Sequence, residues 1–108
     1  MPHDPHLADL MRGALRGRRG IVEKKMFGGF CWMLDGNMLA GVEVGRYMFR
    51  VGKALEAEAL ARPGARPMDI TGRPMRGLVW VDADAALEAG LEDWIALAER
   101  YVGTLPPK

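Results

Sequence analysis

The stretch Lys24-Lys25-Met26-Phe27-Gly28-Gly29-Phe30 decides the fold prediction, because two adjacent glycines follow a bulky apolar pair just where a strand begins. Glycine adopts backbone conformations that are closed to other residues. The run Met26-Phe27-Gly28-Gly29 fits a ligand-facing loop or a structural bulge. A phosphate-binding loop is followed by a helix N-terminus, whereas a strand follows here, so the structural interpretation, with Phe27 anchored in the core, is favoured.

The residues on both sides of this stretch predict helices. Upstream, Asp4 followed by Pro5 is a strong helix start, and apolar residues recur at helical spacing as far as Leu15. The closing segment from Asp82 to Val102 has the same periodicity, and Gly90 is a candidate break within it. Both helices therefore have an apolar face that needs a sheet to pack on.

Three short β-type runs follow the double glycine, at 30–34, 38–44 and 46–51. The turns Asp35-Gly36-Asn37 and Gly45-Arg46 predict that they form an antiparallel meander. The remaining elements expected are a short helix and two further strands, at 53–61, 68–70 and 78–81. The sequence thus predicts an α+β fold of two layers, a five-stranded antiparallel sheet with N- and C-terminal helices packed on one face.

Length and composition fit one globular domain over residues 1–108, with a core at about 5–103 and an irregular tail at 104–108. Apolar residues make up 49% of the chain and charged residues 27%, a mixture typical of proteins that fold alone. The single cysteine, Cys31, forms no intrachain disulfide. We find no secretory leader and no apolar run of membrane-spanning length, so we expect a cytoplasmic, bacterial protein.

Charge is distributed unevenly although the formal net charge is only +1. Cations dominate two separate segments, and the four taken as candidate partner-binding residues are Lys24, Lys25, Arg73 and Arg76. Anions dominate residues 82–100. The basic segments form a patch only if they converge in space, and the near-zero net charge argues against whole-domain attraction to nucleic acid.

The chain offers no constellation of catalytic or ligand-binding residues. Cys31 has no neighbouring base in the sequence and is expected to be a packing residue. The two histidines, His3 and His6, lie at the N-terminus with too few fixed ligands for a metal. Glu43 and Lys53 are dispersed acid–base residues without a coupled partner. We therefore expect no catalytic residues, no cofactor and no metal.

Methionine is abundant, with eight residues in the chain. Six fall in the region of the predicted sheet, namely Met26, Met33, Met38, Met48, Met68 and Met75. Flexible thioethers suit either an adaptable binding surface or a loosely packed core. The core is favoured, and a methionine-rich sheet face open to solvent would indicate the binding surface.

Taken together, several of these features resemble the TfoX N-terminal domain family. They are the run 26–30, the hairpin 35–40, the run 47–51, a glycine-proline loop and a late tryptophan strand, in one order over about Leu7 to Val102. The resemblance implies a small two-layer α+β fold. The family includes regulators of natural competence, in which this domain is joined to a second, C-terminal domain. It implies no catalytic residues.

The functional prediction is a non-enzymatic regulatory domain that contacts an unknown protein partner through a sheet face or edge strand and the flanking cations. A homodimer through the sheet is compatible with the same features. The first alternative is a nucleic-acid-binding accessory protein in transcription regulation. The second is a small-ligand-binding domain or a minor enzyme.

Overall fold

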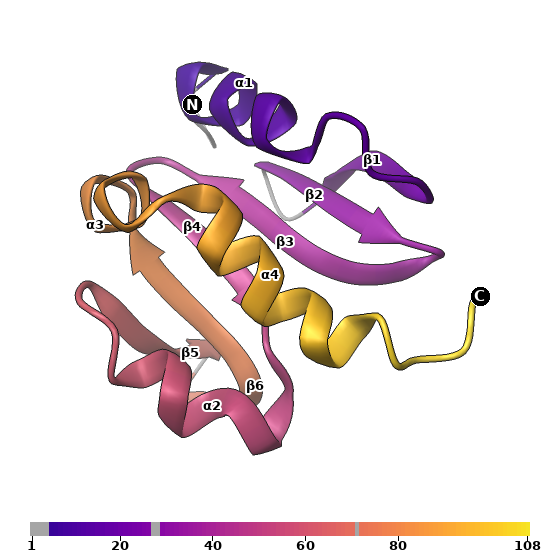
Figure 1. The fold of residues 1–108 in the computed structure, drawn as a ribbon. Coiled ribbons are helices and arrows are strands. Elements are labelled where there is room, and N and C mark those ends of the chain that lie inside the picture. Colours follow the sequence, from indigo (N-terminus) through magenta and orange to yellow (C-terminus); the bar gives the residue numbers. More distant parts are fainter. Residues whose placement is uncertain (1–4, 27–28, 71) are drawn as a thin grey trace.

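The computed structural model describes residues 5–26, 29–70 and 72–108 and shows one sheet with four helices (Figure 1). The six strands lie in the order β1-β2-β3-β4-β6-β5, and every neighbouring pair is antiparallel. The helices are α1 (Pro5–Leu15), α2 (Gly52–Leu60), α3 (Ala83–Ala89) and α4 (Leu91–Val102). The strands are β1 (Ile21–Met26), β2 (Gly29–Leu34), β3 (Asn37–Glu43), β4 (Arg46–Arg50), β5 (Ala65–Ile70) and β6 (Arg73–Asp82).

The predicted α+β class, the open antiparallel sheet and the strand meander are confirmed, but the sheet has six strands, not five. The strand that the sequence prediction missed is β1, part of which lies in one of the two cation-rich segments. It is an edge strand whose residues 22–25 are exposed, so its side chains are mostly polar and lack the apolar alternation that identifies a half-buried strand.

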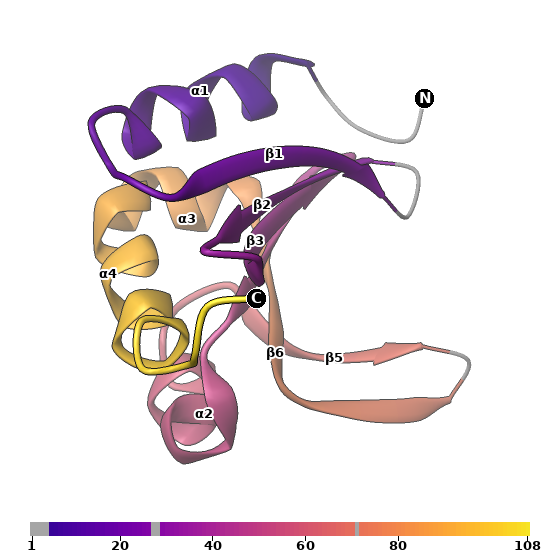
Figure 2. The same cartoon turned by 90° about the vertical axis from the view of Figure 1, so that its right-hand side faces the viewer.

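The core lies between the sheet and the helices, which cover one face of it (Figure 2). Alternate residues of β4 and β6 point into this layer, where Trp94 of α4 stacks on Phe49 with ring centroids 5.2 Å apart. Helix α1 contributes Met11 and Leu15 to the same cluster. The hydroxyl of Tyr47 donates a buried hydrogen bond of 2.7 Å to the carbonyl of Leu7, which ties α1 to β4.

Gly90 divides the C-terminal helical segment in two, as the sequence predicts, because its φ of 100° lies outside the helical region. The tail after Val102 forms neither helix nor strand. It turns back to the β2–β3 hairpin, where the amide of Lys108 donates to the carbonyl of Asp35 at 2.8 Å and Asn37 donates to the carbonyl of Pro106 at 3.0 Å. The C-terminal tail therefore packs against the β2–β3 hairpin at the end of the sheet.

Strands β5 and β6 extend beyond the rest of the sheet. Pairing with β4 begins only at Leu78, so among the described strands β5 alone pairs with β6 before that residue. The bend is at Gly77, whose φ is +86° and whose carbonyl accepts a hydrogen bond from the amide of Val51 at 2.8 Å. The two-stranded ribbon projects on the side away from the helices (Figure 2).

Candidate functional site

The sheet has a second face, which the helices leave uncovered. Side chains alternate along a strand, so the neighbours of core residues such as Trp32, Phe49 and Val79 point to this other side. The strand register places one row of them across the whole sheet: Lys24, Cys31, Gly41, Met48, Trp80 and Arg66. A parallel row begins with Val22, Met33 and Met38. We call the surface formed by these nine residues, with Met68 and Leu78, the open face.

Sulfur-containing side chains form the floor of the open face. A cluster separate from the main core holds Cys31, Met48, Met68 and Leu78, all buried, with Met33, Met38 and Trp80 packed half-buried against them. The methionines of this cluster share features of both alternatives, a packed core and an adaptable surface. Met48 and Met68 are buried, as a core position requires, but their cluster lies on the side of the sheet without helices.

Gly41 makes this floor possible. A Cβ at this position would lie 3.1 Å from Cε of Met48 and 3.3 Å from Sγ of Cys31. The missing side chain therefore lets residues from β2 and β4 meet over the backbone of β3. Burial raises the pKa of the Cys31 thiol, which disfavours the thiolate needed for nucleophilic chemistry. Cys31 is a packing residue, as the sequence suggests.

Paired charges border the floor at the β4–β6 side. The guanidinium of Arg46 lies 3.7 Å from the ring centroid of Trp80, and it also contacts Glu43, with its Nε donating at 3.0 Å and its Nη2 at 2.9 Å. Arg66 forms an ion pair with Asp82. These contacts fix the orientation of Trp80 and leave little uncompensated charge at this border.

The sequence model of the TfoX N-terminal domain matches residues 14–101. The chain belongs to the TfoX N-terminal domain family. The match spans α4 almost to its end and every strand of the sheet, so it includes the whole open face. No curated protein and no solved structure matches the chain.

Within this TfoX N-terminal domain, the four predicted partner-binding cations do not converge. Lys24 and Lys25 lie on β1, whereas Arg73 and Arg76 lie on β6, four strand spacings away. At about 4.8 Å per spacing, β1 and β6 lie roughly 19 Å apart across the sheet. Lys24 belongs to the open face and Lys25 to the opposite one. Arg76 is bound to Glu56 of α2 at 2.8 Å.

The double-glycine motif is the β1–β2 hairpin. Met26 ends β1, Gly29 begins β2, and the two residues are paired in register. Phe27 and Gly28 lie outside the described residues, so the predicted packing of Phe27 lies outside them as well. The paired strands place the motif at the end of a hairpin, and the element directly after it is the strand β2, not a helix.

Nothing in the local sequence connects Cys31 and Met33 to Trp80, Arg46 or Gly41. The alternation within Phe30-Cys31-Trp32-Met33 is the one signal available in the sequence. The proximity of the other residues of the open face depends on the order of the strands in the sheet.

Among the described residues, no group of three or more His, Cys, Asp or Glu side chains is placed to hold a metal ion. None of the described helices is both long and apolar enough to cross a membrane.

Proposed function

We propose that this chain is a non-enzymatic regulatory domain that binds a protein partner through the open face. The observation that supports this most directly is the methionine-rich cluster on the side of the sheet without helices. Thioether side chains change conformation at low cost and adapt to different apolar partners. Membership of a family that includes competence regulators supports a regulatory role in the cytoplasm of a bacterium.

Several apolar side chains of the open face remain in contact with solvent, where a partner would cover them. Val22 is 53% exposed and lies next to the half-buried Met33 and Met38 in one cross-strand row. Trp80, on the far side of the floor, is half-buried as well. Burial of such surface by a partner is favourable at about 25 cal/mol per Å².

The sheet edges are less suited to a partner than the face. A partner strand added to an edge needs free backbone amides and side chains without strong charge. The edge strand β1 carries the adjacent Lys24 and Lys25, and the edge strand β5 carries Pro67, which has no amide proton. Both features disfavour pairing with an added strand. The open face is therefore favoured over the sheet edges as the contact surface for a partner.

Nucleic acid is the second candidate partner, since Arg46 and Trp80 together resemble a stacking platform. Two ion pairs oppose it, because Arg46 and Arg66 are each already matched by a carboxylate. An enzymatic role has less support. Glu43 contacts Arg46, and Lys53 lies in the first turn of α2 on the helix side of the sheet.

The test uses an immobilised domain and native lysate, with and without nuclease treatment, followed by titration of the captured protein against purified variants. Val22→Asp puts a charge on the open face. The matched control is Val44→Asp, since Val44 is 60% exposed in the β3–β4 turn. We expect Val22→Asp to weaken binding at least about tenfold and the control to leave it unchanged.

Equal affinity of the two variants would refute the open face as the contact surface. Loss of the captured protein after nuclease treatment, together with affinity for a single-stranded oligonucleotide that falls steeply with salt, would favour the nucleic-acid alternative. Self-association that Val22→Asp abolishes would identify a homodimer through the same face.

A further inference from the structure

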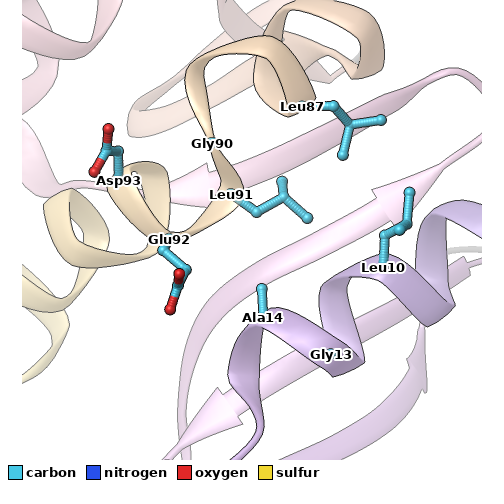
Figure 3. A pocket seen from close by; sticks show the side chains of 8 residues that line it. All are labelled: Leu10, Gly13, Ala14, Leu87, Gly90, Leu91, Glu92 and Asp93. Carbon is cyan, nitrogen blue, oxygen red and sulfur yellow. The ribbon is translucent and has the colours of Figure 1, made fainter.

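A groove on the helical layer, on the opposite side of the molecule from the open face, has features of a second docking surface. It lies between α1 and the α3–α4 junction and has a volume of about 450 Å³. Figure 3 shows Leu10 and Ala14 of α1 directed toward Leu87 and Leu91 across it. Leu87 is 37% exposed even though it is a large apolar residue. The groove therefore has an apolar floor that no described residue fills.

Gly13 is one of the residues that line the groove. It lies inside α1, where glycine lowers helix stability relative to alanine. Outside its own helix backbone, a Cβ at this position would meet no heavy atom of the described residues within 4 Å, so no contact with them requires glycine. Glycine at this position lowers the stability of α1 and leaves space on the wall of the groove. Another molecule needs such space to approach the helix closely.

The groove has a negative rim. Glu92 and Asp93, in the first turn of α4, line it, and the described lining residues include no lysine or arginine. Asp84 and Glu88 of α3 line a neighbouring hollow of about 600 Å³. All four side chains are exposed, and none forms an ion pair with another described residue. The carboxylates of α4 also complement the dipole of that helix. Together with the carboxylates of α3 they make this surface negatively charged.

We propose that this groove binds an amphipathic, basic helix of a partner protein. Most of the wall is helix interior, whose backbone groups are hydrogen-bonded internally, so an extended peptide would find main-chain donors only at the first turn of α4. A helix carries its own backbone hydrogen bonds and presents apolar residues at i, i+3, i+4 and i+7. One of these enters beside Gly13, and lysine or arginine residues on its flank face Glu92, Asp93 and the carboxylates of α3.

The experiment titrates the ¹⁵N-labelled full chain with two synthetic 18-residue helical peptides that share a leucine face and differ in flanks of lysine or of glutamate. The lysine peptide is expected to shift the amide signals of Gly13 and Gly90 saturably, and the glutamate peptide is not. The lysine peptide should bind at least about tenfold more weakly when Gly13→Leu fills the groove. Val22→Asp on the open face should leave this binding unchanged, which separates it from the proposed function.

Two control variants test whether Gly13→Leu acts by filling the groove. Gly13→Ala should raise Tm by roughly 4 °C, showing that substitution at this helix position is tolerated. Ala96→Leu, at an exposed position on α4, adds the same side chain away from the groove and should bind like the original chain. The proposal fails if both peptides bind alike, if neither binds, or if Gly13→Leu binds normally. Concentration-dependent dimerisation that Gly13→Leu abolishes would make a second copy the occupant and would overturn it too.

Discussion

At the scale of single residues, Glu56 links the α2 helix to the projecting ribbon. Its carboxylate accepts a hydrogen bond of 2.8 Å from Nε of Arg76 and one of 3.4 Å from the amide of Gly77. The bond from Arg76 is the main reason that the pKa of Glu56 is lowered from 4.5, followed by the Gly77 amide and the positive charges of Arg76 and Lys53. Arg76 therefore has a structural role besides any contact with a partner.

This arrangement predicts a pH-dependent contribution to stability. Because the folded-state pKa of Glu56 lies below its unfolded value, the stabilisation is complete above pH 4.5 and is lost as the pH falls through the folded-state pKa. Glu56→Gln should lower the free energy of unfolding by about 1 kcal/mol at pH 7 and by less at pH 3. Urea denaturation at several pH values measures this difference.

Glu58→Gln is the matched control, since the Glu58–Arg100 pair is 3.3 Å long and about half-exposed on both sides. It should change stability by less than the Glu56 variant does. A deficit for Glu56→Gln that stays constant from pH 7 to pH 3 would show that the loss comes from packing and not from charge.

At the scale of elements, polar contacts supplement the apolar packing that holds α1 on the sheet. The hydroxyl of Tyr47 reaches the carbonyl of Leu7 across 40 residues of sequence. On the exposed side, Arg12 donates to both carboxylate oxygens of Glu23, at 2.6 and 2.8 Å, and Trp32 donates to the same carboxylate at 3.1 Å. These bonds connect α1 to β4 and to the edge strand β1.

Tyr47→Phe should therefore loosen α1 more than any other element. Removing the buried hydrogen bond costs about 1 kcal/mol, and amide exchange in α1 should accelerate while exchange in β3 and β4 follows only the global loss. Hydrogen–deuterium exchange with resolution of single amides measures this. Tyr101→Phe is the control, because the Tyr101 hydroxyl has no hydrogen bond within the described residues. Equal acceleration in every element would contradict a local role for Tyr47.

At the scale of the whole molecule, the sheet has two edges and one uncovered face, and each affects association differently. The edges carry Lys24 and Lys25 on one side and Pro67 on the other. Like charges directly opposite each other destabilise paired strands, so two copies meeting at β1 would repel. The open face has no such protection across its methionine floor.

The double variant Lys24→Val, Lys25→Val should accordingly self-associate through β1. Its sedimentation coefficient is expected to rise with concentration, because the strand would read Ile-Val-Glu-Val-Val-Met with a single charge left. The control removes two cations elsewhere, with Arg16→Val and Lys53→Val, both at exposed positions. Identical sedimentation of the two double variants would mean that the lysines do not protect the edge.

Much of the fold was accessible from local sequence patterns. Helical periodicity located α1, α2 and the α3–α4 segment, and turn residues located the β2–β3–β4 meander. The missed strand β1 is stabilised by its pairing with β2 and by the Arg12–Glu23 contact, which are non-local and leave no alternation to recognise. The candidate site was less accessible, since neither the row from Lys24 to Arg66 nor the groove at Gly13 exists until the strands and helices are placed.

The sequence alone therefore determined the α+β class, the helix and turn positions and the family, because these depend on residues near one another in the chain. Only the tertiary structure decided which cations lie together, which face stays uncovered and where α1 and α4 leave a groove. Strand order sets those distances. It is fixed by contacts between residues far apart in sequence, such as Trp94 with Phe49, and no local pattern encodes them.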